Sequence, residues 1–142
     1  MEDGVGRGRL DPDPEGRFHS LRRELGVTSF GLNEIYMRPG ERGRIHRHER
    51  QEEVFLVLDG TLTISIEGEE QTLQRGELIR VAPPVRRQLI NAHREPLMLL
   101  ALGAEGEHVG RDGEAFETWE DAGGATPQEI PLPEDLPESA LR

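Results

Sequence analysis

The stretch "GERGRIHRHERQEEVFLVLDG", residues 40–60, decides how this sequence is interpreted. Residues 54–58 form an unbroken apolar run that ends at the turn signal Asp59-Gly60, as is typical of a buried β-strand. Shortly before this run, His46 and His48 lie two residues apart, and side chains two apart in a strand point the same way. The stretch is therefore predicted to be a hairpin whose first strand presents two imidazoles side by side.

Short β segments continue on both sides of this stretch, between Val27 and Leu102, with no helical period of useful length. Turn signals rich in Gly, Pro, Asn and Asp separate them. The expected strands are at about 28–37, 44–48, 53–58, 61–66, 70–74, 77–81, 86–91 and 96–102. Eight short strands in about 75 residues are typical of a sandwich or barrel, so we expect one all-β barrel domain over residues 18–102.

Three flanking segments are expected around this domain's strands. Residues 1–17 are dense in glycine, proline and charge, which predicts a flexible N-terminal arm. A short helix is expected at 19–26, with Ser20 as its N-cap and Gly26 as its stop. Residues 103–142 are acidic and Pro-rich and are expected to pack as an extended tail on the barrel or on a partner subunit.

Two of the expected strands differ in how much of their surface is apolar. In "TLTISI", residues 61–66, apolar and polar residues alternate, which predicts one buried face. In "PLMLLAL", residues 96–102, nearly every residue is apolar, which predicts cover on both faces. The helix, the tail or another subunit can supply that cover, and on this ground we expect a homodimer.

The composition excludes several kinds of chemistry. The chain has no cysteine, which excludes a disulfide framework, a thiolate metal site and a cysteine nucleophile. All 17 basic residues are arginine, which excludes a lysine Schiff base. The net charge of −11 arises mainly in residues 103–142, so neither nucleic acid nor a membrane surface is an expected partner. No stretch is long and apolar enough to span a bilayer, and a soluble, cytoplasmic protein is expected.

His46 and His48 are candidate metal ligands, together with a carboxylate. Their Cα atoms would be about 7 Å apart in a strand, so both rings can approach one ion. Glu53 begins the next strand and can reach the same point; Glu52 is the alternative, because parity alone does not decide which of the two faces inward. Two imidazoles and a carboxylate can hold a divalent metal and leave coordination positions open. The competing interpretation is a solvated, charged strand.

The whole opening stretch resembles the first motif of the cupin superfamily: a glycine, five residues, His-x-His, four residues, a glutamate, six residues and a glycine. The resemblance covers about residues 27–102. It implies a small single-domain cupin with a double-stranded β-helix, or jelly-roll, barrel. It also implies that His46, His48 and Glu53 bind a divalent metal, such as Fe, Mn, Ni or Zn, inside the barrel.

The second cupin motif is matched only in part by the segment "GELIRVAPPVRRQLIN". Gly76 and Asn91 fall in place, whereas Ala82 and Pro84 replace the proline and the glycine of the motif. Arg87 replaces the histidine that would be the fourth ligand. A guanidinium does not lose its proton in a protein and has no lone pair to donate, so Arg87 cannot bind a metal.

Three interpretations of Arg87 are open. In the first, three ligands keep the metal, and Arg87 orients an anionic group of the substrate beside it. In the second, Arg87 pairs with Glu53 in place of a cation, and the pocket binds an anion without metal; repulsion between a guanidinium and a dication favours this one. In the third, Arg87 is a rim residue that reaches solvent.

Three classes of function follow from these interpretations. The first is a small metal-dependent enzyme of the dioxygenase, isomerase or lyase type that acts on a small anionic metabolite. The second is a metal-free protein that binds a small anionic ligand without catalysis. The third is a dimeric protein with a vestigial pocket.

Overall fold

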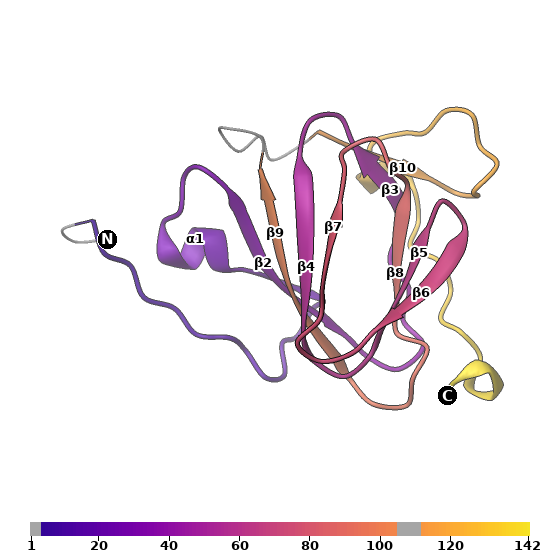
Figure 1. Ribbon diagram of the computed structural model, residues 1–142, viewed down its shortest axis with the longest axis horizontal. Helices are drawn as coiled ribbons and strands as arrows, with labels where there is room; N and C mark the ends of the chain where they lie inside the picture. Colours follow the sequence, from indigo (N-terminus) through magenta and orange to yellow (C-terminus); the bar gives the residue numbers. More distant parts are fainter. Residues whose placement is uncertain (1–3, 105–111) are drawn as a thin grey trace.

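The computed structural model describes residues 4–104 and 112–142 and contains two antiparallel sheets of five strands each (Figure 1). In spatial order, the first sheet consists of β1 (Phe18–Ser20), β2 (Gly31–Met37), β9 (Leu97–Ala104), β4 (Glu52–Asp59) and β7 (Leu78–Val81). The second consists of β10 (Gly113–Phe116), β3 (Ile45–His48), β8 (Arg87–Ile90), β5 (Leu62–Ile66) and β6 (Glu69–Leu73). The sheets face each other, as in a jelly-roll barrel, so the expected fold class is confirmed.

The apolar core lies between the two sheets. Leu97 and Leu99 of β9 and Leu62 and Ile64 of β5 belong to one cluster, and each is 0% exposed. Burying one such side chain stabilises a fold by about 1.5–3 kcal/mol. The alternation of side chains along each strand is what brings these residues to a common interior.

All eight expected strands are present, with small shifts at their ends, and two further strands were not expected. β1 pairs with β2, and β10 pairs with β3 in antiparallel register, with Ala115 opposite His46. Both additional strands are only three or four residues long. The partner of β10 lies far away along the chain, and β1 is only three residues long, so local sequence patterns do not reveal either strand.

The short helix α1 (Leu21–Leu25) has the two cap residues that the sequence predicts, whereas His19, expected in the helix, belongs to β1. The Ser20 hydroxyl accepts a hydrogen bond from the backbone N–H of Arg23 at 3.2 Å. Gly26 ends the helix in the left-handed conformation, at φ 77°, which glycine adopts without a steric penalty. The helix packs on β2 and buries Leu21.

Both faces of β5 are buried, although its alternating sequence predicts only one. Besides its apolar residues, Thr63 is 0% and Ser65 3% exposed. Ser65 lines a small hollow together with Trp119 and Leu136 from the C-terminal part of the chain. The tail therefore covers the outer face of the second sheet, where hydroxyl side chains would otherwise meet solvent.

The N-terminal arm runs alongside β2 (Figure 1). The backbone N–H of Asp11 donates a hydrogen bond to the buried carboxylate of Glu34 at 2.8 Å. The Arg38 side chain donates another to the carbonyl of Pro14 at 2.6 Å. These contacts hold the arm at two points, and its flexibility stays a prediction.

The tail also contacts the segment that precedes β3. Arg42 donates two hydrogen bonds to the carbonyl of Glu134, and the backbone N–H of Leu136 donates one to Gly40. Two short 3-10 helices, η1 (Pro127–Glu129) and η2 (Glu138–Ala140), interrupt this otherwise extended path. Residues 105–111, part of the expected tail, lie outside the described residues. Within the described chain, no helix has the length and apolar character to cross a membrane.

Candidate metal centre

Three possible metal ligands converge inside the barrel. His46 and His48 come from β3 of the second sheet, and Glu53 comes from the beginning of β4 of the first. One ligand atom from each residue lies within 4.8 Å of the other two. Oε1 of Glu53 is 3.1 Å from Nε2 of His48 and 3.7 Å from Nε2 of His46. The structure thus brings together the three residues that the sequence predicts as ligands.

The neighbouring Glu52 points away from this cluster. Its carboxylate pairs with Arg80 at the surface, and both side chains are about half exposed. The Glu53 side chain is only 12% exposed. Strand alternation therefore turns Glu53 inward and Glu52 outward, which resolves the choice that parity in the sequence leaves open.

Each histidine is oriented by a hydrogen bond from its other ring nitrogen. Nδ1 of His46 lies 3.1 Å from the carbonyl oxygen of Arg44, and Nδ1 of His48 lies 2.8 Å from Oδ1 of Asp112. A carbonyl or a carboxylate only accepts, so Nδ1 must donate in both cases. In the neutral rings, the lone pair then lies on Nε2, the atom that faces Glu53.

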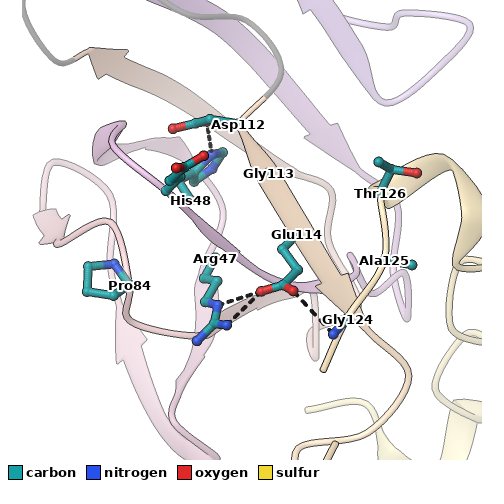
Figure 2. Close-up of a pocket in the computed structure, with 10 residues that line it drawn as sticks. Arg47, His48, Pro84, Asp112, Gly113, Glu114, Gly124, Ala125 and Thr126 are labelled. Carbon is teal, nitrogen blue, oxygen red and sulfur yellow. Dashed lines mark hydrogen bonds and ion pairs between the residues drawn. The ribbon is translucent and has the colours of Figure 1, made fainter. Parts of the chain in front are cut away.

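Asp112 is a part of the site that the sequence did not reveal. It precedes β10, and its carboxylate accepts a hydrogen bond from His48 (Figure 2). It also accepts from the backbone N–H groups of Arg50 and Gln51. Burial alone would raise the pKa of Asp112, but these donors hold it below its ordinary value. Only the pairing of β10 with β3 brings this residue to His48.

Two atoms of the cluster have unused hydrogen-bonding capacity. Nε2 of His48 and Oε1 of Glu53 are buried and make no properly oriented hydrogen bond within the described residues, despite their separation of 3.1 Å. A buried polar atom without a partner is costly. A divalent cation would satisfy both atoms, and imidazole nitrogen with carboxylate oxygen is a donor set that Zn and the other transition metals accept. The residues present therefore fit such a metal.

Arg87 lies behind this cluster, directly opposite His46 in the ladder between β3 and β8. Its side chain is 0% exposed, which rules out the interpretation as a solvent-reaching rim residue. One terminal nitrogen donates to the carbonyl of Val85 at 2.8 Å, and the other lies 3.4 Å from Oε1 of Glu53. Burial lowers the pKa of Arg87, whereas the charge of Glu53 raises it.

The charges around Glu53 keep it ionised. Burial alone would raise the pKa of this carboxyl group, but hydrogen bonds from the rings of His46 and His48 in their protonated form, and the charge of these rings, hold it well below its usual range. A negative charge is therefore present at the point where the two Nε2 atoms converge.

A cavity of about 290 Å³ inside the barrel opens onto the cluster, a size suited to a small molecule. Most of its wall is apolar, with Ile35, Phe55 and Leu89 contributed by three different strands. Its polar lining consists of Arg17, Asn33, Arg44, His46, His48, Gln51 and Glu53. Arg87 does not line this cavity, because it lies beneath Glu53.

A larger hollow of about 580 Å³ lies on the outer side of β3 and β10 (Figure 2). Three of its charged groups already have partners: Arg47 pairs with Glu114 at 2.7 Å, and Asp112 accepts from His48. It does not contain the three candidate ligands together. The inner cavity is therefore the candidate site.

Comparison with known proteins identifies the kind of domain that carries this site. Residues 33–103 match the family model described as "Cupin domain". The chain is 31% identical over 72 residues to the tetracenomycin polyketide synthase protein TcmJ of Streptomyces glaucescens. This match covers 51% of the chain and 48% of that protein, so the chain spans about half the length of the curated relative.

Solved structures share the same architecture. A cupin protein from Bacteroides fragilis matches with a TM-score of 0.65 at 24% identity, over 74% of this chain and 86% of its own. A sugar phosphate isomerase from a cupin superfamily, from Silicibacter pomeroyi, matches with a TM-score of 0.63 at 21% identity, over 80% of this chain and 76% of its own. At these identities, the likeness establishes the fold alone.

Proposed function

This chain belongs to the cupin family, and from that premise we propose that it binds a divalent metal through His46, His48 and Glu53 and acts on a small, anionic metabolite. The reaction is of the dioxygenase, isomerase or lyase type. The isomerase class is kept among the three because a sugar phosphate isomerase from Silicibacter pomeroyi has the same fold. The metal is Fe, Mn, Ni or Zn.

One observation carries this proposal. Both Nδ1 atoms are engaged by fixed acceptors, so the Nε2 atoms of the two rings converge on the ionised carboxylate of Glu53. Within the described residues, Oε1 of this carboxylate makes no properly oriented hydrogen bond and has Arg87 as an ion-pair neighbour at 3.4 Å. This arrangement is unfavourable without a cation and favourable with one. Preorientation of the rings by Asp112 and by the carbonyl of Arg44 also lowers the cost of assembling the ligand set.

The metal, when bound, would supply Lewis-acid or dioxygen chemistry at the positions that three protein ligands leave open. The residues of the chain exclude water and balance the charges around the site. The apolar wall around Phe55 and Leu89 excludes water from the substrate. The negative charge of Glu53 offsets part of the positive charge of the ion, and Arg87 holds that carboxylate from behind. A direct contact between Arg87 and an anionic substrate group stays a prediction.

A metal-free pocket is the second candidate. The observation in its favour is the ion pair between Arg87 and Glu53 at 3.4 Å, since the guanidinium already neutralises the carboxylate that a metal would use. In that case, the protein binds a small anion without catalysis. The two candidate functions differ in whether a divalent cation binds in the pocket.

Calorimetric titration of the metal-free protein with Mn²⁺ and Zn²⁺ tests the proposal. We expect one site per chain that disappears in His46→Ala. His93→Ala is the matched control, because it removes a histidine that lies outside the three-ligand group. If neither ion binds the original protein, or if His46→Ala binds as well, the metal-free pocket is the better account.

A further inference from the structure

Arg44 brings an uncompensated positive charge to the wall of the inner cavity. It precedes His46 by two residues, so its side chain follows the same strand alternation as the two histidines, and it lines the same cavity. Its Nε donates a hydrogen bond to the carbonyl of Ile130 at 2.6 Å. Among the described residues, no carboxylate lies within ion-pair distance of its guanidinium, and both terminal nitrogens are left for a ligand.

The other two arginines of this region are already neutralised. Arg17 also lines the cavity, but its Nε lies 3.3 Å from the carboxylate of Glu41. Arg87 pairs with Glu53 and does not line the cavity. Arg44 is therefore the charged group that an anion inside the cavity would meet unpaired.

The remaining wall restricts what such an anion can look like. Ile35, Phe55 and Leu89 form an apolar surface of the same cavity that Arg44 and the three candidate ligands line. A polyhydroxylated ligand would leave several hydroxyl groups without partners against this surface, which is costly. A ligand with an apolar body and one acidic group would bury the first on the wall and present the second to the guanidinium.

We propose that Arg44 determines the substrate specificity of the centre, by binding the carboxylate of a small amphiphilic acid whose apolar body lies against Ile35, Phe55 and Leu89. This inference rests on the proposed function, because the acid would lie in the cavity that the candidate metal ligands also line. It assigns the substrate class as an aromatic or branched aliphatic carboxylic acid. A sugar phosphate, with several hydroxyl groups to satisfy, is expected to bind less well against the apolar part of this wall.

The C-terminal tail completes the recognition site. The carbonyl of Ile130 fixes Arg44, and Pro127 and Leu132, on either side, line the cavity. Arg42 holds the same tail through the carbonyl of Glu134, but does not line the cavity. Arg42 and Arg44 thus share the tail contact and differ in access to the ligand.

This difference gives a matched pair of variants. Binding of phenylacetate, phenylacetamide and ribose 5-phosphate is measured by calorimetry on the full chain loaded with Zn²⁺ and on the metal-free protein. We expect phenylacetate to bind best, and Arg44→Gln to weaken its binding by about tenfold to a hundredfold, as for loss of a charge-assisted bidentate contact. Phenylacetamide, which lacks the negative charge, should bind weakly, and equally to the original protein and to Arg44→Gln. Arg44→Lys should lose less than Arg44→Gln, and Arg42→Gln should bind phenylacetate as the original protein does.

Three results would overturn the inference: equal phenylacetate binding by Arg44→Gln and the original protein, an equal loss in Arg42→Gln, or preference for ribose 5-phosphate. The metal content of each sample separates this inference from the proposed function. Stoichiometric zinc without Arg44-dependent binding of phenylacetate overturns the inference and leaves the metal centre standing. Arg44-dependent binding in a protein that takes up no zinc supports the recognition of the acid and overturns the metal role.

Discussion

Arg87 lies directly opposite His46 in the ladder between β3 and β8, at the position where the cupin motif has a fourth histidine ligand. The substitution therefore replaces a possible ligand with a buried cation, 3.4 Å from the carboxylate of Glu53. Two opposing effects result. The guanidinium offsets the charge of Glu53, but it also repels any dication that the same carboxylate binds.

Arg87→His should strengthen metal binding. The imidazole supplies a lone pair and removes the nearby positive charge, so we expect at least about a tenfold lower dissociation constant for Zn²⁺. Competition with a chromophoric chelator measures this dissociation constant. Arg86→His is the matched control, because Arg86 packs over Phe116 and not toward Glu53. Unchanged affinity in Arg87→His would mean that Arg87 does not occupy a ligand position.

Asp112→Asn should weaken metal binding while leaving the fold intact. The amide has only one accepting oxygen, so it cannot accept from Nδ1 of His48 and from the backbone N–H groups of Arg50 and Gln51 together. Loss of such an orienting partner costs about tenfold to a hundredfold in metal affinity. Glu114→Gln is the control, since Glu114 lies two residues after Asp112, in β10, and pairs with Arg47 instead of His48. Nitrogen-15 NMR of His48 should show a changed tautomer balance in Asp112→Asn only. A similar loss of affinity in both variants would contradict the orienting role.

His19 should make the stability depend on pH. Its hydrogen bond to Glu34, with further attraction from Glu24 and Asp11, raises the pKa of His19 above its ordinary value of 6.5. Because the folded-state pKa is the higher one, the stabilisation is complete below about pH 6.5 and disappears as the pH rises through the folded-state pKa.

The free energy of unfolding, measured by urea denaturation across this range, checks the pH dependence. His19→Gln should cost stability at acidic pH and much less at alkaline pH. His93→Gln should not reproduce this pattern, since no carboxylate lies within ion-pair distance of His93 among the described residues. A loss in His19→Gln that stays constant with pH would show that the charge of His19 is not involved.

Leu99→Ala should lower the free energy of unfolding by about 2–5 kcal/mol, because Leu99 is 0% exposed and its truncation leaves a cavity between the sheets. Leu78→Ala is the control. Leu78 is 62% exposed, so we expect a change within about 0.5 kcal/mol. Equal effects of the two substitutions in chemical denaturation would contradict the assignment of the core.

The fold was predictable because its signals are local. Residues 61–66 and 96–102 carry the alternation or the continuous apolar character of strands, and turn residues mark their ends. Ser20 and Gly26 likewise delimit the helix through short-range hydrogen bonds. The cupin-like spacing of the first motif then indicated which residues share the interior, and those residues do converge.

What could not be predicted depends on contacts between distant parts of the chain. β10 pairs with β3 from beyond residue 112, and this pairing alone delivers Asp112 to His48. The alternation of residues along the strand did not tell whether Glu52 or Glu53 points into the barrel, because only the position of the barrel interior decides this. The predicted homodimer depends on a second chain and stays a prediction.

The metal content of the protein, purified without chelator, tests the central claim most directly. Elemental analysis should find about one transition-metal ion per chain in the original protein and almost none in His46→Ala. A folded original protein that contains no metal and takes none up on addition of Fe²⁺, Mn²⁺, Ni²⁺ or Zn²⁺ would contradict the claim. The cluster of His46, His48 and Glu53 would then be an anion pocket neutralised by Arg87.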